Sequence, residues 1–182
     1  MIKLFKLLPL ALTLCFMAGC QNKAERAELE KFRAQAKLEE QNISLVKRLY
    51  EELSKANIEI LQELFTSDFA YYSPSENVTP LSREELSKAL KMYYSAFPDF
   101  HYDIQDIFAK GDRVAVRFIA QFTHSQEFMG LPPTGKQIQV SATAIFNKFK
   151  DGKVAEVKKN MDDIGMMTQL GMELKPKEAE KK

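Results

Sequence analysis

The chain has 182 residues, a length that suits one ordinary domain with a short extension better than two full domains. Apolar residues make up 45% and charged residues 28%, so the chain can bury a core and is not disordered as a whole. The 26 Lys and Arg residues are balanced by 25 Asp and Glu residues, and this argues against a nucleic-acid partner. Both cysteines lie within the first 20 residues, which excludes a disulfide framework or a cysteine-based metal site in the rest of the chain.

Residues 1–19 have the features of a signal peptide: two lysines, an apolar run over residues 7–17, and small residues before Cys20. The apolar run is too short to cross a bilayer of ~30 Å. An ordinary cleavage site is one interpretation, but small residues followed at once by cysteine resemble the lipobox of bacterial lipoproteins. We therefore expect an acylated Cys20 that anchors the protein to a membrane of the cell envelope. Gln21 favours the outer membrane over the inner one, with the domain facing the periplasm or the exterior.

Residues 20–40 are expected to form the lipidated cysteine and a charged helical tether. From Lys23 onward this segment is rich in Ala, Glu, Lys, Arg and Leu, without glycine, proline or β-branched residues, which favours a helix. Its apolar stripe is narrow and predicts a solvated helix; a short coiled-coil contact is the alternative. The domain proper is expected over residues 41–171, followed by a charged tail over residues 172–182.

Three helices are predicted in the first half of the domain. The first has one apolar face, formed by Ile43, Val46, Leu49, Tyr50 and Leu53. Asn57 is the expected N-cap of the second helix. Ser82 with Glu85 three residues later predicts a capping box at the start of the third, which Pro98 terminates.

The second half of the domain has the period-two pattern of strands. Residues 114–124 form a long run, and its apolar face is made of Val114, Val116, Phe118, Ala120 and Phe122, with His124 at the end. Asp151-Gly152 predicts a hairpin turn between strands at 137–149 and 154–161, and a last helix over residues 163–170 stops at Gly171. Helices followed by a long antiparallel meander predict an α+β fold, with the helices packed on one face of a curved sheet.

Two polar features are candidates for chemistry. His124 is either a hydrogen-bonded core residue or a catalytic or ligand-orienting group. Asp162 and Asp163 stand where the last strand meets the last helix, so their local role is an N-cap, although one aspartate can cap while the other points inward. The two histidines are 23 residues apart and lack acidic partners at ligand spacing, which argues against a metal site.

Several short motifs occur in a characteristic order: Phe97–Tyr102 (FPDFHY), Gly111–Ala115 (GDRVA), His124, Gly130–Lys136 (GLPPTGK), and Asp162-x-x-Gly165 with Gln169-Leu170-Gly171. This series resembles the SnoaL-like polyketide cyclase family, also called ester cyclases, over residues 41–171. The resemblance implies a nuclear-transport-factor-2-like fold, in which a strongly curved antiparallel sheet wraps around three N-terminal helices as a cone with one apolar pocket.

The same resemblance implies one acid/base residue in the pocket and neither a metal nor an organic cofactor. The family's catalytic aspartate falls on Asp162, and His124 is the matching donor to a developing enolate oxygen. A carboxylate in an apolar cone loses solvation, and the rise in its pKa makes it a competent base. We expect six further residues to bind the ligand: Tyr72, Tyr94, Phe118, Phe122, Lys158 and Asn160.

The chain also departs from its relatives. Tyr72 stands where they often carry histidine, and Lys158 where they often carry tryptophan. Lys158, Asn160 and Asp162 would share one face of the last strand, and a lysine there lowers the pKa of Asp162, which works against a general base.

Two functions follow from these observations. The first is a membrane-anchored, non-enzymatic lipoprotein that binds a small hydrophobic molecule, or another envelope protein, in the cone. The alternative is a cofactor-independent cyclase, isomerase or hydrolase that acts through Asp162 on a carbonyl substrate. In both, the expected partners are a small molecule and the membrane, and a homodimer is left open.

Overall fold

The computed structural model describes residues 8–73 and 79–173, with side chains from Lys23 onward. The chain divides into two compact units, residues 1–38 and 39–182. Parts of the expected signal peptide and tail, residues 1–7 and 174–182, lie outside the described residues. Among the helices that are described, none is both long enough and apolar enough to cross a bilayer.

Helix α1 (Leu8–Ser54) joins the predicted tether and the first predicted helix in one element. Between residues 23 and 38 its side chains are largely exposed, including Leu29 at 48% and Phe32 at 60%. Further along, one face of the same helix is buried in the domain core through Val46, Leu49, Tyr50 and Leu53. Over residues 23–54, for which side chains are described, the helix therefore buries an apolar face only from residue 39 onward.

The turn that ends α1 corrects the expected role of Asn57. The Ala56 N–H bonds to the Leu53 carbonyl and the Asn57 N–H to that of Glu52, while Ala56 takes a left-handed φ of 56°. This is the Schellman pattern of a helix C-terminus. The Asn57 amide also donates to the Glu52 carboxylate at 2.7 Å, so it does not cap α2 (Ile60–Leu64), which follows Glu59 without a side-chain cap.

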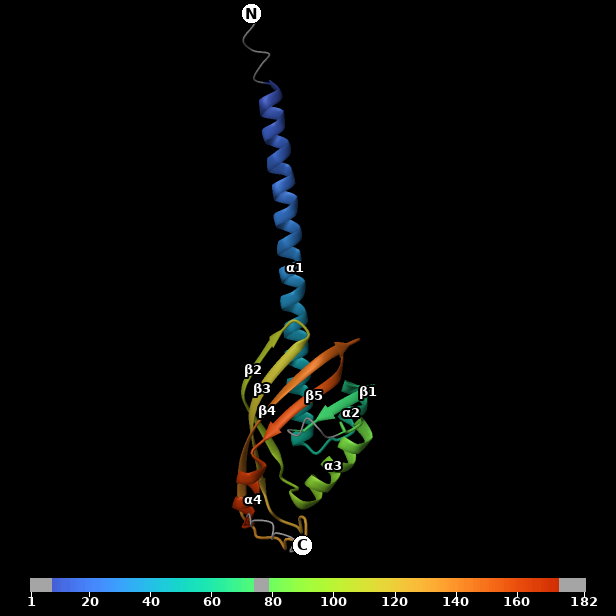
Figure 1. The fold of residues 1–182 in the computed structure, drawn as a ribbon, viewed down its shortest axis with the longest axis vertical. Coiled ribbons are helices and arrows are strands. Elements are labelled where there is room, and N and C mark those ends of the chain that lie inside the picture. The colour runs from blue at the N-terminus through green and yellow to red at the C-terminus, as the bar shows by residue number, and fades with distance from the viewer. Residues whose placement is uncertain (1–7, 74–78, 174–182) are drawn as a thin grey trace, which may run out of the picture. The chain divides into compact units, whose positions relative to one another are not determined.

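One curved five-stranded sheet forms the other layer, in the order β1-β5-β4-β3-β2 (Figure 1). The strands are β1 (Phe65–Tyr72), β2 (His101–Lys110), β3 (Arg113–Thr123), β4 (Gln137–Lys150) and β5 (Lys153–Met161). Strands β2 to β5 form an antiparallel meander, and β1 is added parallel to β5. The predicted turn at Asp151-Gly152 joins β4 to β5, with φ values of 49° and 72° that suit a two-residue hairpin.

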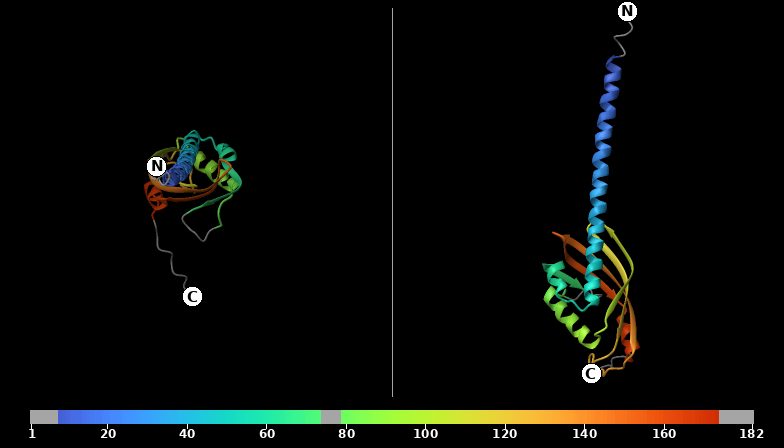
Figure 2. Two further views of the ribbon diagram at one scale, coloured as in Figure 1. Left: turned by 90° about the horizontal axis from the view of Figure 1, so that it is seen from above. Right: turned by 180° about the vertical axis from the view of Figure 1, so that it is seen from behind.

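Helix α3 (Arg83–Ala96) and the end of α1 pack against one face of this sheet, as the view from behind in Figure 2 shows. The inward residues of β3 are almost completely buried, as the alternating pattern predicts. Val140, Ala142, Ala144 and Phe146 continue the core on β4. These features confirm the predicted α+β fold with a curved sheet that does not close.

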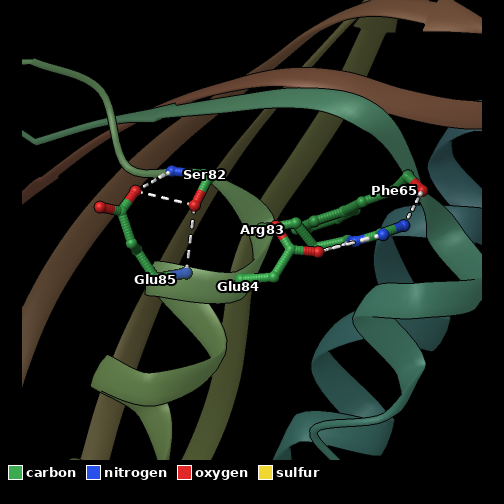
Figure 3. A network of polar contacts seen from close by, with 5 residues as sticks. All are labelled: Phe65, Ser82, Arg83, Glu84 and Glu85. Atoms are coloured by element: carbon green, nitrogen blue, oxygen red, sulfur yellow. Dashed lines mark hydrogen bonds and ion pairs between the residues drawn. The ribbon is translucent and has the colours of Figure 1, made fainter.

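Helix α3 (Arg83–Ala96) begins with the predicted capping box, which the structure confirms (Figure 3). The Glu85 carboxylate accepts hydrogen bonds from the Ser82 N–H at 2.8 Å and its hydroxyl at 2.7 Å, and the Ser82 Oγ accepts from the Glu85 N–H at 3.2 Å. Arg83 pairs with Glu84 and donates to the Phe65 carbonyl at 3.4 Å. These contacts fix the start of α3 beside the start of β1.

Candidate active site

A cavity of about 290 Å³ lies between α3, β1, β5 and the first residue of α4 (Asp163–Leu170). Its apolar wall is formed by Leu81, Leu86, Ala89, Leu90, Phe100 and Met161. Its polar groups are Tyr71, Ser73, Tyr93, Tyr94, Tyr102, Lys159 and Asp163. A smaller cavity of about 60 Å³ reaches deeper into the core and shares with it Tyr71, Leu86, Leu90, Tyr102 and Lys159. A mostly aromatic and aliphatic pocket with a few polar groups is typical of small-molecule sites.

Strand register decides which residues of β5 face this cavity. Lys159 pairs with Ala144 and Met161 pairs with Ala142, and both alanines are buried on the inner face of β4. Because paired residues of neighbouring strands point to the same side, Lys159 and Met161 also point inward. Along its other edge β5 pairs with β1, where Val157 is the partner of Tyr71, and both residues line the smaller cavity.

Two of the cavity tyrosines, Tyr94 and Tyr102, form hydrogen bonds within the protein. The Tyr94 hydroxyl donates to the Leu53 carbonyl at 2.6 Å and shares a hydrogen bond with Tyr102. Since Tyr94 already donates to Leu53, it accepts from Tyr102. Burial raises the pKa of Tyr94 to about 12 and that of Tyr102 well above its ordinary value, so both hydroxyls stay protonated.

The other two tyrosines of the cavity, Tyr71 and Tyr93, interact electrostatically with Asp163. Burial, and to a smaller extent the Asp163 carboxylate, raises the pKa of both Tyr71 and Tyr93. Within the described part of the chain, neither hydroxyl takes part in a hydrogen bond with another protein group. The cavity therefore holds one carboxylate and two protonated hydroxyls that are available to a ligand.

Asp162 and Asp163 have separate roles. Asp162 is the N-cap of α4, and its Oδ1 accepts from the Gly165 N–H at 2.8 Å. Asp163, the first residue of the helix, lines the cavity and raises the pKa of Tyr71, Tyr93 and Lys159. One aspartate thus caps the helix while the next one faces the cavity.

His124 lies in the core, away from the cavity lining. It is fully buried, its ring packs 5.6 Å from that of Phe97, and its Nδ1 is 3.1 Å from the Thr134 hydroxyl. Its Nε2 is buried without a hydrogen-bond partner among the described residues. This position corresponds to the core interpretation of His124 rather than to a donor in the pocket.

The expected pocket position of Lys158, Asn160 and Tyr72 is corrected by the register. Lys158 and Asn160 alternate with Lys159 and Met161, so they lie on the opposite face of the sheet and are exposed. The Lys158 ammonium stands 5.4 Å from the centre of the Tyr72 ring, which places Tyr72 on that outer face as well. The three residues do form a polar surface, but it faces away from the cavity.

The remaining expected residues are inside the fold. Tyr94 lines the main cavity and Phe118 lines the smaller one. Phe122 is buried behind them and stacks on Phe100 with ring centres 4.7 Å apart. Phe122 therefore supports the cavity wall through Phe100.

The sequence-based prediction missed Lys159, Asp163, Tyr71 and Tyr93. The sequence did contain a signal for Lys159. The two-residue turn at Asp151-Gly152 pairs Lys150 with Lys153, and counting outward along both strands from this pair places Lys159 opposite Ala144. From Ile138 to Phe146 the even-numbered residues of β4 are apolar, so their β5 partners Val157, Lys159 and Met161 share the core side.

As for metal ligands, the described residues contain no group of three or more His, Cys, Asp or Glu side chains suited to a metal ion.

Comparison with known proteins assigns the family. The sequence profile of the SnoaL-like polyketide cyclases matches residues 44–170. IdmH of Streptomyces antibioticus, provisionally assigned as a polyketide cyclase, is 32% identical, with a TM-score of 0.65 over 72% of this chain and 99% of IdmH. AclR of Streptomyces galilaeus, provisionally assigned as a hydroxylase, is 26% identical, with a TM-score of 0.66 over 71% of this chain and 95% of AclR. No curated protein matches the chain significantly. The chain therefore belongs to the SnoaL-like polyketide cyclase family.

Proposed function

We propose that this protein binds a small, largely apolar molecule with a carbonyl group in the 290 Å³ cavity. The observation that carries the proposal is the lining of that cavity: aromatic and aliphatic side chains on most sides, and the hydroxyls of Tyr71 and Tyr93 beside Asp163. Apolar walls supply affinity through removal of surface from water, and hydroxyl donors orient an acceptor such as a carbonyl oxygen. Relatives that are provisionally assigned as polyketide cyclases support a ligand of this class.

We further propose that an acylated Cys20 holds this binding domain at a membrane of the cell envelope, with the outer membrane favoured. The support is the sequence around Cys20: a basic start, a short apolar run and small residues directly before the cysteine. Two or three acyl chains provide stable anchoring, since each buried methylene contributes about 0.8 kcal/mol.

Filling the cavity tests the binding function. Ala89 lines the cavity from α3, whereas Met92 on the same helix is 53% exposed. We expect Ala89→Phe to weaken binding of the neutral fluorescent probe N-phenyl-1-naphthylamine at least tenfold, because the new ring occupies the ligand's volume. The control, Met92→Phe, adds the same ring outside the cavity and should leave the dissociation constant unchanged. Equal affinity of both variants and the wild type would contradict the proposed site.

A catalytic role is the second candidate function, and the position of Asp163 favours it. A carboxylate beside two protonated hydroxyls can remove a proton next to a bound carbonyl group while the hydroxyls donate to the enolate oxygen. In this proposal the acid/base role moves from Asp162, whose carboxylate is engaged as the helix cap, to Asp163.

Paired substitutions separate the two aspartates. Asp163→Asn should reduce turnover of an activated ester or ketone by about 10²–10⁴-fold, the usual contribution of a general base. Asp162→Asn should keep turnover and melting temperature close to those of the wild type, because asparagine is an equally good N-cap. Loss of turnover only in Asp162→Asn would return the role to Asp162, and no turnover above buffer in the wild type would leave ligand binding as the function.

A further inference from the structure

Lys159 is a lysine whose side chain points into the apolar interior of the cone. It lines both the main cavity and the smaller inner one, where its neighbours include Leu86, Leu90, Phe118 and Val157. Ala144, its partner on β4, is too small to cover it. The side chain is only partly exposed, and it stands where the two cavities meet.

The charge of Lys159 is poorly compensated. Among the described residues, no acidic oxygen comes within 4 Å of its Nζ. Burial lowers the pKa of Lys159, and the Asp163 carboxylate opposes this shift only in part. A desolvated lysine with a lowered pKa carries more of the neutral amine near pH 7, and the neutral amine is the nucleophile.

Lys158 is the natural comparison on the same strand. It is exposed on the opposite face of the sheet, where its ammonium stands 5.4 Å from the centre of the Tyr72 ring. Water and the ring face surround this ammonium, in place of the apolar side chains around Lys159. Adjacent lysines of β5 thus differ in the environment of the amine.

We propose that Lys159 captures the carbonyl group of a bound aldehyde or ketone as an imine, with Asp163 transferring the protons. The proposal rests on the ligand-binding function above and specifies its ligand as a molecule with a reactive carbonyl group. Both residues line the same cavity, so a ligand held there meets the amine and the carboxylate together.

The reaction needs no other reactant. The Nζ lone pair forms a bond to the carbonyl carbon while the carbonyl π electrons move to the oxygen. Transfer of a proton from nitrogen to oxygen, with Asp163 as the carrier, gives a carbinolamine. Loss of the hydroxyl group as water, with a proton returned by Asp163, leaves a carbon–nitrogen double bond. The product is the imine plus one water molecule, and no atom is oxidised or reduced by the protein.

Reductive trapping tests the proposal. The full chain is incubated near pH 7 with 2-naphthaldehyde and sodium cyanoborohydride, which converts an imine into a stable secondary amine. Peptide mass spectrometry then locates the modified lysine. We expect Lys159 to be labelled at least tenfold more than Lys158. Lys158→Met should keep the labelling of Lys159, whereas Lys159→Met and Lys159→Arg should abolish it; the arginine variant keeps a cation, which guards against a folding defect.

The outcomes separate this inference from the proposed function. 2-Methylnaphthalene has no carbonyl group, so its binding, measured by displacement of N-phenyl-1-naphthylamine, reports on the cavity alone. Binding of 2-methylnaphthalene without labelling of Lys159 overturns the imine and leaves ligand binding intact. Labelling spread evenly over surface lysines also overturns the imine. Absence of both binding and labelling overturns the imine and the proposed ligand class together.

Discussion

Asp162 and Gly165 show how closely neighbouring residues fit at the start of α4. The Asp162 carboxylate folds over Gly165 to accept its N–H, and a Cβ built on this glycine would lie only 2.1 Å from the Asp162 Oδ2. The absence of a side chain at Gly165 thus leaves room for the capping carboxylate. The cap leaves Asp163 as the first helical residue, beside the cavity.

Gly165→Ala should therefore have an effect that depends on Asp162. Alanine favours the helix by about 1 kcal/mol relative to glycine, but its methyl group displaces the capping carboxylate, which costs about 1 kcal/mol. In wild type the two effects nearly cancel, whereas in an Asp162→Ala background only the favourable one remains. Urea unfolding of the four proteins should show a coupling of about 1 kcal/mol between the sites. Additive effects would mean that the cap does not hold in solution.

Lys159 makes stability depend on pH in a predictable direction. Burial lowers its pKa in the folded chain below the ordinary value of 10.5, so between the two values the unfolded chain binds more protons. Stability from this group therefore rises with pH across that interval, and its full penalty is present below the folded pKa. Lys159→Met should be most stabilising below the folded pKa of Lys159, with a gain that shrinks as the pH rises toward 10.5.

The measurement is the difference in urea midpoint between variant and wild type, as a function of pH. Lys158→Met provides the control, because Lys158 lies exposed on the other face. Its difference from the wild type should be flat over the same range. If the curves of Lys159→Met and the wild type run parallel, the lysine is not desolvated in the folded protein.

At the scale of elements, three segments meet at the C-terminal end of α1. The Tyr94 hydroxyl of α3 donates to the Leu53 carbonyl, and the Tyr102 N–H of β2 donates to the Ser54 Oγ at 3.1 Å. The Leu53 carbonyl accepts from the Ala56 N–H in the turn that ends α1, and the Tyr94 hydroxyl supplies its second hydrogen bond. These bonds join α1, α3 and β2 where the floor of the cavity forms.

Tyr94→Phe tests the strength of this junction. The substitution leaves the Tyr102 hydroxyl without its acceptor and removes one of the two hydrogen bonds to the Leu53 carbonyl, which keeps that from the Ala56 N–H. An unsatisfied buried polar group costs about 1–3 kcal/mol. We expect a fall in unfolding free energy of that size by urea denaturation. Tyr93→Phe removes a hydroxyl from the next residue of the same helix, one without a hydrogen bond among the described residues, and should cost clearly less. Similar losses in both variants would speak against the junction.

At the scale of the whole molecule, the SnoaL-like domain and the N-terminal segment differ in burial: the domain has a core, whereas the described part of the segment is largely exposed. Residues 39–182 form a compact unit with its own core, and residues 1–38 belong to a second unit. From Lys23 to Leu38 the helix is charged and largely exposed, which suits a segment that is solvated rather than packed. A domain of this kind is suited to work at a membrane surface when its N-terminus carries a lipid.

The predicted lipid anchor depends on one residue, Cys20. Cys20→Ser should move the protein from the membrane fraction to the soluble or unprocessed fraction, because serine has no thiol to be acylated. Fractionation and intact-mass measurement of the mature protein provide the readout. A variant that stays in the membrane with the same mass as the wild type would contradict the lipoprotein hypothesis.

The sequence alone determined the features that depend on local chemistry. The capping box at Ser82, the alternation along β3, the turn at Asp151-Gly152 and the end of α4 at Gly171 were all predicted and are present. Each depends on residues a few positions apart, whose preferred backbone geometry does not need the rest of the fold. The ordered motifs also identified the family that the comparisons establish.

Tertiary structure decided which side of β5 faces the cavity. Residues 158–161 are Lys, Lys, Asn and Met, so polar residues occur on both sides of the strand and the local pattern favours neither face. The choice comes from pairing with β4, where the buried Ala142 and Ala144 face Met161 and Lys159 and so place these two residues on the core side. A shift of one residue exchanges the two faces of a strand. For this reason the cavity holds Lys159 and Asp163, while Lys158 and Asn160 lie on the outside.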